Sequence, residues 1–312
     1  MTPLVRGVSL EVGPGERVGL VGESGSGKSL TLLAVMGLLG GSAVEVTGGS
    51  VRLGSAELAG APDRVLRGFR GSQIAMIYQD PMTSLDPVQR VGAQIAEGLR
   101  AHGTSRRSAW ERTLAVLAEV QLPDPARLAR AYPHELSGGM RQRVMIAAAL
   151  AGNPRLLLAD EPTTALDVTI QRQILALVAR LQQARNLAVL WVTHDLGVAA
   201  QFVQRLAVMY AGRIVEVGPT PAVFAAPQHP YTAALLRSVP SAVSSSSVSG
   251  SRGALGQIPG SPPDPARLPP GCSFAPRCVQ VRSSCSVTDP VLAARGPEVA
   301  AACLVPVAEW QS

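Results

Sequence analysis

No cysteine precedes Cys272 in this 312-residue chain, and all four cysteines fall between Cys272 and Cys303. This distribution excludes a small fold held together by disulfides and predicts a local metal site or a reducible cluster near the C-terminal end. Aromatic residues are also scarce, at 4%, and no run of Arg or Lys is interleaved with them. Because single strands bind by base stacking on aromatic side chains, nucleic acid is not an expected partner.

Lysine is almost absent, since 27 of the 28 cationic side chains are Arg and only Lys28 is Lys. GC-rich coding, which turns most cationic codons into Arg, would produce the same bias. Long apolar runs are missing as well: despite a mean hydropathy of +0.21, no uncharged apolar stretch reaches the roughly 18 residues that a membrane span requires. Residues 1–6 lack the apolar core of a signal peptide. The composition therefore predicts a soluble, cytoplasmic protein.

Short apolar runs typical of strands alternate along the chain with patterns typical of helices. The alternation predicts an α/β fold with a mostly parallel sheet core, to which a helical subdomain at about residues 88–150 is added. A Ser-rich stretch at residues 241–257 is typical of a flexible linker. It would join a main domain at residues 1–240 to a short C-terminal cysteine-containing extension at residues 258–312. The expected strands are residues 8–12, 17–21, 74–78, 155–159 and 188–193, and the expected helices are residues 30–39, 110–120 and 170–185.

A complete phosphate-binding loop pattern lies between the strand at residues 17–21 and the helix that follows. Its glycines let backbone N–H groups converge on phosphate oxygens, and the helix N-terminus adds a favourable dipole. The ammonium of Lys28 would reach the β- and γ-phosphates of a nucleotide, and the hydroxyl of Ser29 would ligate Mg²⁺. The loop consists of Gly22, Glu23, Ser24, Gly25, Ser26, Gly27, Lys28 and Ser29.

Two adjacent acidic residues, Asp160 and Glu161, end the strand expected at residues 155–159. The carboxyl ends of parallel strands lie at one edge of a sheet, where the phosphate loop is also expected. Asp160 would hold Mg²⁺ through water, and Glu161 would polarise an attacking water. Two acids at a strand end could form a solvated turn, but their pairing with a phosphate loop indicates hydrolysis.

A second anion site is indicated far beyond Lys28 in the sequence, where a helix is expected to begin at Ser137. Ser137, Gly138 and Gly139 would present backbone N–H groups at that helix start. One phosphate loop does not require two anion sites. The simplest explanation is that this one serves a nucleotide held by another subunit.

The phosphate loop, the Ser137 helix start and the acidic pair follow one another along the chain as in the nucleotide-binding subunit of an ATP-binding-cassette (ABC) transporter. The chain therefore resembles such a subunit, which has a RecA-like, phosphate-loop NTPase core. The resemblance covers nearly the whole chain and implies an ATP hydrolase that uses ATP and Mg²⁺. It implies that Gln79 senses Mg²⁺ and the membrane partner, that Asp167 couples two nucleotide sites, and that His194 contacts the γ-phosphate. By the same resemblance the Mg²⁺ ligands are Ser29, Gln79 and Asp160, the catalytic residues are Glu161, His194 and Gln79, and the signature that contacts the γ-phosphate across a dimer is Ser137, Gly138 and Gly139.

Three further stretches, residues 78–87, 133–147 and 223–232, are similar to the ATPases of dipeptide and oligopeptide importers. This resemblance implies a peripheral subunit on the cytoplasmic face of the cell membrane. Its implied partners are two membrane permeases and, indirectly, an extracytoplasmic peptide-binding protein. Met140, where the wider superfamily more often has Gln, resembles one member of an unlike ATPase pair and favours a heterodimer.

Other transported solutes and other cassette ATPases are the alternatives to peptide import. An importer of nickel or another small solute, or a peptide exporter, would carry similar motifs. Soluble cassette ATPases that act on ribosomes carry two cassettes, and those that act on chromosomes need room for a long coiled coil. The single motif set disfavours the first type, and the separation between Lys28 and Ser137 is too short for the second.

The tail cysteines are unevenly spaced, with the widest gap between Cys285 and Cys303. This spacing resembles the C-terminal segment of peptide-importer ATPases, which can hold a [4Fe–4S] cluster. Four thiolates also suit tetrahedral Zn²⁺, although close Cys-x₂-Cys pairs are missing. An iron–sulfur cluster is favoured, and zinc or no metal are the alternatives. The candidate ligands of this metal site are Cys272, Cys278, Cys285 and Cys303.

One feature departs from the family: residues 1–30 lack the aromatic that usually stacks on adenine.

Overall fold

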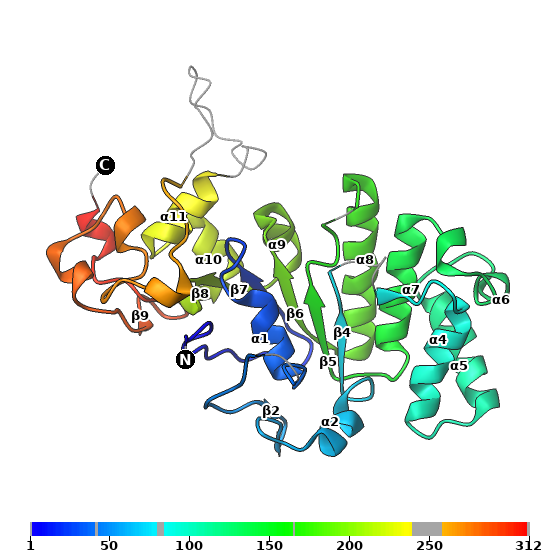
Figure 1. The fold of residues 1–312 in the computed structure, drawn as a ribbon. Helices are drawn as coiled ribbons and strands as arrows, with labels where there is room; N and C mark the ends of the chain where they lie inside the picture. Colours follow the sequence, from blue (N-terminus) through cyan, green and yellow to red (C-terminus); the bar gives the residue numbers. More distant parts are fainter. Residues whose placement is uncertain (1, 41–42, 80–83, 165, 239–257, 311–312) are drawn as a thin grey trace, which may run out of the picture. The chain divides into compact units, whose positions relative to one another are not determined.

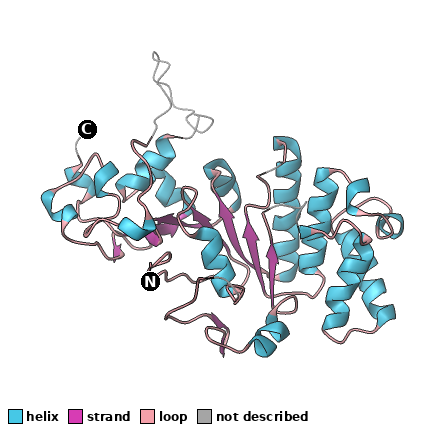
Figure 2. Ribbon diagram, in the orientation of Figure 1, coloured by secondary structure: helices cyan, strands magenta, loops and turns pink. Residues whose placement is uncertain are grey.

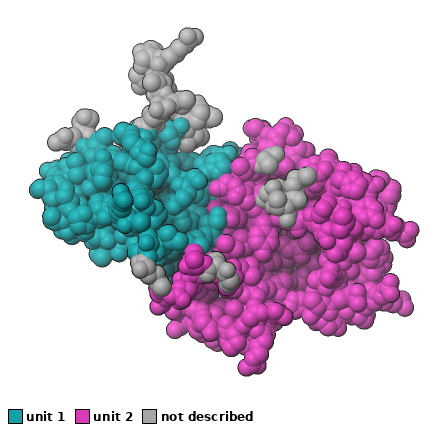
Figure 3. Space-filling view, in the orientation of Figure 1, with its two compact units in different colours: residues 1–11, 18–30, 193–312 teal, residues 12–17, 31–192 magenta. Residues whose placement is uncertain are grey.

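A computed structural model of the chain describes residues 2–40, 43–79, 84–164, 166–238 and 258–310. The described chain forms two compact units, drawn in different colours in Figure 3. Unit 1 comprises residues 1–11, 18–30 and 193–312, and unit 2 comprises residues 12–17 and 31–192. The expected linker at residues 241–257 lies outside the described residues, as do residues 80–83 of one importer-like stretch and Ala165.

Three parallel strands form the sheet of unit 2: β4 (Ile74–Ile77), β5 (Leu156–Asp160) and β6 (Ala188–Thr193). Ile77 is in register with Ala159, and Asp160 with Val192. Nearly every residue of these strands is buried, because both faces of a parallel sheet are covered and the sequence supplies continuous apolar runs. The strands predicted for this region are confirmed, with bounds that differ by at most one residue.

A long helix, α8 (Val168–Arg185), connects β5 to β6 and makes a parallel β-α-β crossover. Its carboxyl end is closed by Asn186, which adopts a left-handed conformation at φ 50°. The side chain of Gln182, 2% exposed, donates to the carbonyl of Gly15 at 2.6 Å. This hydrogen bond joins α8 to the turn that precedes β1 (Arg17–Val21), the first strand of the chain.

Between β4 and β5 the described residues form helices and loops and no strand (Figure 2). Helix α5 packs against α4, α6 and α7, so the four helices form one group (Figure 1). The carboxylate of Glu119 in α5 accepts hydrogen bonds from Arg112 and from Arg185 at the end of α8. Burial opposes ionisation of Glu119, but these two guanidinium groups hold its pKa below the usual value. The helices are α4 (Val91–Ala101), α5 (Arg106–Glu119), α6 (Pro125–Leu128) and α7 (Gly138–Leu150).

Unit 1 contains a mixed set of strands. Strand β1 (Arg17–Val21) pairs in parallel with β7 (Arg205–Tyr210), which pairs in antiparallel fashion with β8 (Arg213–Pro219). Two short strands of the cysteine-containing segment, β10 (Ala300–Ala301) and β9 (Ala293–Ala294), continue from β8. The chain's last segment therefore extends the strand pairing of unit 1 instead of standing apart from it.

Shorter elements complete the fold. Helix α1 (Lys28–Val35) follows the phosphate loop, and a two-strand hairpin of β2 (Arg52–Leu53) and β3 (Ala56–Glu57) precedes α2 (Asp63–Phe69). None of the helices in the described residues is both long and apolar enough to cross a membrane. The remaining helices of unit 1 are α9 (Leu196–Phe202), α10 (Thr220–Ala225) and α11 (Pro230–Arg237).

The strand predicted at residues 8–12 is wrong, because these residues adopt no regular strand. The alternating pattern there indicates one buried face, but a strand also needs a neighbour with which to exchange backbone hydrogen bonds. The chain is instead turned by a local contact, in which the N–H of Gly13 donates to Oε2 of Glu16 at 2.7 Å.

Candidate functional site

The phosphate loop leaves β1 at Gly22 and enters α1 at Lys28, as the sequence predicts. Two of its glycines are required by close packing in unit 1. A Cβ atom on Gly22 would lie 2.1 Å from the carbonyl oxygen of Met209, and one on Gly27 would lie 2.9 Å from the Cε of Met209. Gly27 also has φ +105°, a conformation that L side chains rarely adopt. The backbone of the loop is therefore fixed against β7.

Lys28 is only 5% exposed, and its ammonium is directed back over the loop. Nζ donates to the carbonyl of Gly22 at 2.8 Å and to that of Glu23 at 3.0 Å. The carbonyl of Ser26 accepts from the N–H of Gly212 in the turn between β7 and β8, at 2.9 Å. The hydroxyl of Ser26 is buried and has no hydrogen-bond partner among the described residues. Such a group is suited to accept a ligand contact.

In unit 2 Asp160 is the last residue of β5 and Glu161 follows it, and Gln79 follows β4 at the same edge of the sheet. Asp160 is 6% exposed. Glu161 adopts φ +45°, a left-handed conformation that is uncommon for a residue with a side chain, and its N–H donates to the carbonyl of Val192 at 3.0 Å. Strain of this kind is held only where the surroundings fix the backbone, and it often occurs at functional positions.

The carboxylate of Glu161 is bracketed by two polar side chains. Its Oε2 accepts from the hydroxyl of Thr164 at 3.1 Å and from the amide of Gln79 at 3.5 Å. The structure thus brings Gln79 and Glu161 together, as expected for residues at the carboxyl ends of adjacent parallel strands. Both remain open enough to meet a ligand, since Gln79 is exposed and Glu161 half-buried.

Ser137 is the N-cap of α7, and its hydroxyl accepts from the N–H of Met140 at 3.3 Å. The prediction of a helix start at this residue is confirmed. Gly138 has open space around the position of a Cβ, whereas a Cβ on Gly139 would lie 2.9 Å from the Cγ2 of Ile170 in α8. The two glycines therefore differ: Gly139 is needed for packing of α7 on α8, and Gly138 leaves the helix N-terminus accessible.

Asp167 lies between β5 and α8 and belongs to unit 2. His194 directly follows β6 and belongs to unit 1. Asp167 is the N-cap of α8, and its Oδ1 accepts from the N–H groups of Thr169 and Ile170 at 3.0 and 2.9 Å. His194 is exposed just after β6. The phosphate loop and His194 lie in unit 1, whereas the other predicted nucleotide residues lie in unit 2: Gln79, Ser137, Gly138, Gly139, Asp160, Glu161 and Asp167.

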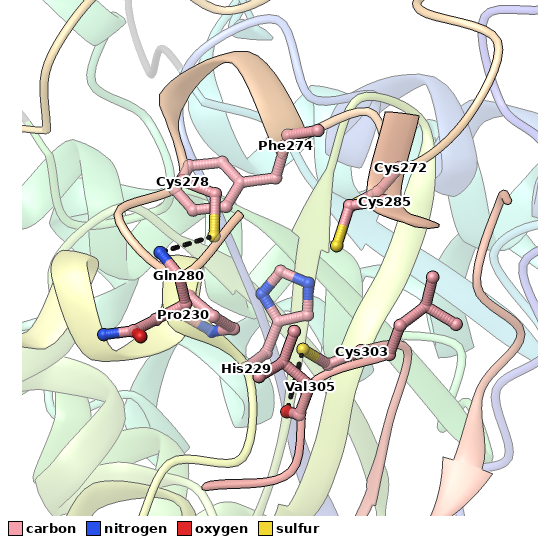
Figure 4. Close-up of a pocket in the computed structure, with 11 residues that line it drawn as sticks. His229, Pro230, Cys272, Phe274, Cys278, Gln280, Cys285, Cys303 and Val305 are labelled. Carbon is pink, nitrogen blue, oxygen red and sulfur yellow. Dashed lines mark hydrogen bonds between the residues drawn. The ribbon is translucent and has the colours of Figure 1, made fainter. Parts of the chain in front are cut away.

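The four cysteines line one pocket in unit 1, together with His229 and Phe274 (Figure 4). Burial raises the pKa of Cys272 and Cys303, and it raises the pKa of Cys278 to about 11. The Sγ of Cys278 accepts from the N–H of Gln280 at 3.3 Å. The spacing in the sequence thus led correctly to a local group of cysteines.

The predicted metal site is not supported by this arrangement. Among the described residues no three or more His, Cys, Asp and Glu side chains are grouped closely enough to hold a metal ion. The structure supports a pocket lined by four thiols and gives no metal site among the described residues.

Sequence reasoning missed two buried polar residues here: His229, which lines the pocket, and Glu216, which contacts His229. His229 is 2% exposed, its Nδ1 accepts from the N–H of Tyr231 at 3.0 Å, and burial lowers its pKa to about 3. Glu216 is fully buried and accepts from the N–H groups of Gln228 and His229, and burial raises its pKa. The stretch at residues 223–232 contains several of these residues, but their pairing is visible only in the fold.

Two family models match the chain. Residues 5–164 match the model described as ABC transporter, and residues 215–285 match the model described as oligopeptide/dipeptide transporter, C-terminal region. Two proteins named as peptide import ATP-binding proteins, from Brucella ovis and Brucella melitensis, are each 49% identical over 98% of this chain and 91% of their own length. A protein of Sinorhizobium fredii named as a peptide ABC transporter ATP-binding protein is 49% identical over 97% of this chain and 89% of its own.

Solved structures of an ATP-binding cassette, MJ0796, share the fold. A dimeric post-hydrolysis state bound to ADP and Pi matches with a TM-score of 0.61 and 31% identity, over 70% of this chain and 90% of that one. A second dimeric structure of the same bacterial ABC transporter cassette matches equally well.

The chain belongs to the ATP-binding family of ABC transporters, and it is an ATP hydrolase of the cassette type. Within that class it carries the C-terminal region of the oligopeptide/dipeptide transporter ATPases.

Proposed function

We propose that this chain hydrolyses ATP to drive the import of peptides through a membrane complex. The observation that carries the proposal is that one chain matches both the ABC transporter model and the oligopeptide/dipeptide transporter C-terminal model. The phosphate loop geometry supports the ATP-binding part, because a buried ammonium and a glycine-fixed backbone are what a polyphosphate needs.

In this proposal each predicted nucleotide residue has a defined role. Lys28 contacts the β- and γ-phosphates, Glu161 polarises the attacking water, and His194 contacts the γ-phosphate. Three oxygen donors, the hydroxyl of Ser29, the carboxylate of Asp160 and the amide of Gln79, suit Mg²⁺, which prefers oxygen ligands. When bound, the ion would neutralise charge on the phosphates.

A second subunit would complete each site. The accessible N-terminus of α7, at Ser137 and Gly138, would contact the γ-phosphate held by a partner, and Asp167 would couple the two sites. We propose that the partner is a non-identical ATPase of the same class, that two permeases carry the pair at the cytoplasmic face of the membrane, and that an extracytoplasmic peptide-binding protein delivers substrate. We also propose a cassette at residues 1–240 and a cysteine-containing extension at residues 258–312.

The test of this function is ATP-dependent uptake of labelled peptides by proteoliposomes that contain the chain with its ATPase partner, both permeases and the binding protein. We expect uptake of di- to oligopeptides that requires ATP and is competed by unlabelled peptide. Uptake of nickel or another small solute without peptide competition would show that the complex serves the related class. Outward movement of peptide would identify an exporter.

We further propose that the four tail cysteines ligate an iron–sulfur cluster. Four thiols lining one pocket support it, together with the backbone N–H directed at the Sγ of Cys278, a contact that adjusts cluster potentials. Tetrahedral Zn²⁺ is the alternative, because four thiolates suit it as well. The residues concerned are Cys272, Cys278, Cys285 and Cys303.

Anaerobic purification of the full chain tests this assignment. We expect broad visible absorption at about 400 nm and about four iron atoms per chain, in line with a Cys₄ [4Fe–4S] cluster. Cys285→Ser should remove both the absorption and the iron. Zinc at about one atom per chain without visible absorption would replace the cluster by a zinc site, and absence of both metals would leave four structural thiols.

A further inference from the structure

Every polar group of Glu23, the second residue of the phosphate loop, has a partner within unit 1. Its N–H donates to the hydroxyl of Tyr231 at 2.9 Å, and its carbonyl accepts from Nζ of Lys28 at 3.0 Å. Its carboxylate accepts two hydrogen bonds from the guanidinium of Arg277, at 2.7 and 3.0 Å. Arg277 lies 254 positions further along the chain, so the cysteine-containing segment reaches directly into the loop.

Arg277 is itself held firmly. Its side chain is 6% exposed, its Nε donates to the carbonyl of Pro259 at 2.8 Å, and its Nη1 donates to the hydroxyl of Tyr210 at 3.3 Å. The ring of Tyr210 packs on those of Tyr231 and Phe274, with centroids 4.6 and 5.2 Å apart. A planar guanidinium fixed in this way offers a two-pronged carboxylate site in a set orientation.

The charge of Glu23 matters because of what the loop binds. Its carboxylate places a negative charge in a loop whose ligand is a polyphosphate, and like charges at such short range repel. The side chain of Glu23 is 23% exposed, so water screens this repulsion only in part. The paired guanidinium cancels the charge and also fixes the residue whose carbonyl orients Lys28.

We propose that Arg277 is a positioning residue of the nucleotide site: by holding and neutralising the carboxylate of Glu23, it allows the phosphate loop to accept the polyphosphate of ATP. The inference rests on the proposed binding of ATP at this loop. It makes the cysteine-containing segment a support of the ATP site.

The test is the Kd of the full-length chain for ATP with Mg²⁺, measured at low temperature for Arg277→Met, Glu23→Gln and the double variant. Arg277→Met should raise the Kd about tenfold, because the Glu23 charge is then uncompensated. Glu23→Gln in that background should restore the Kd to within about twofold of the unaltered chain. Raising the ionic strength from about 0.05 to about 0.5 M should shrink the Arg277→Met defect, since salt screens partly exposed charges.

Arg282→Met is the matched control, because Arg282 lies in the same segment and its exposed guanidinium contacts the carboxylate and the carbonyl of Glu309. The Kd of this variant should match that of the unaltered chain. If Arg277→Met does not fold, Arg277→Lys takes its place, with a rise of about threefold that Glu23→Gln removes. An unchanged Kd in the folded variant, or a defect that Glu23→Gln does not rescue, would overturn the inference. Failure of the unaltered chain to bind ATP would instead overturn the proposed function, and this inference with it.

Discussion

Glu161→Gln is expected to lower the rate of ATP hydrolysis by the assembled transporter at least about 100-fold, while ATP binding is retained. The amide keeps the size of the side chain and its contact with Thr164, but it carries no negative charge and is a poor base toward water. The change does not affect the left-handed backbone conformation of Glu161 or the hydrogen bond from its backbone N–H to the carbonyl of Val192. The measurement is phosphate release by the complex, compared with the Kd for ATP.

The matched control for this substitution is Glu111→Gln. Glu111 forms an exposed pair with Arg107 on α5, so loss of its charge should leave turnover within about twofold of the unaltered complex. Hydrolysis at the full rate in Glu161→Gln would show that another group activates the water. Loss of ATP binding would show that the carboxylate stabilises the loop or the metal.

The sequence was most informative where a short segment determines its own structure. The apolar run of β6 has the predicted bounds, Ala188–Thr193, because a strand buried on both faces leaves a continuous apolar signature. The loop from Gly22 to Lys28 was also predicted correctly, and two of its glycines, Gly22 and Gly27, are required by the approach of β7. At residues 8–12 an alternating pattern predicted a strand that does not form, because a strand also depends on a partner that is distant in sequence.

The contacts that join distant segments could not be predicted. With 27 arginines in the chain, no local pattern distinguishes Arg277 as the partner of Glu23, although Glu23 lies in the phosphate loop and Arg277 in the predicted C-terminal extension. The cysteines illustrate the same limit. Their spacing indicated a cluster, but the burial that raises the pKa of Cys278 comes from the fold around it.

Lys28→Arg is expected to lower ATP turnover by at least about tenfold and to weaken ATP binding. Lys28 is 5% exposed, and its compact ammonium fits over the carbonyls of Gly22 and Glu23. A guanidinium is larger and planar, and Gly27 and Gly22 are already in close contact with Met209, so the loop has little room to adjust. Phosphate release by the complex and the Kd for ATP measure both effects.

Arg107→Lys provides the control for exchanging one cation for another, since Arg107 is 90% exposed and its replacement should change neither quantity. The comparison separates two explanations of the composition. If Lys28→Arg retained full activity, the single lysine among 28 cations would be an accident of coding. If only Lys28→Arg is impaired, lysine was kept at this position for its function while arginine replaced it elsewhere. The loop then requires a compact ammonium that can donate hydrogen bonds in several directions.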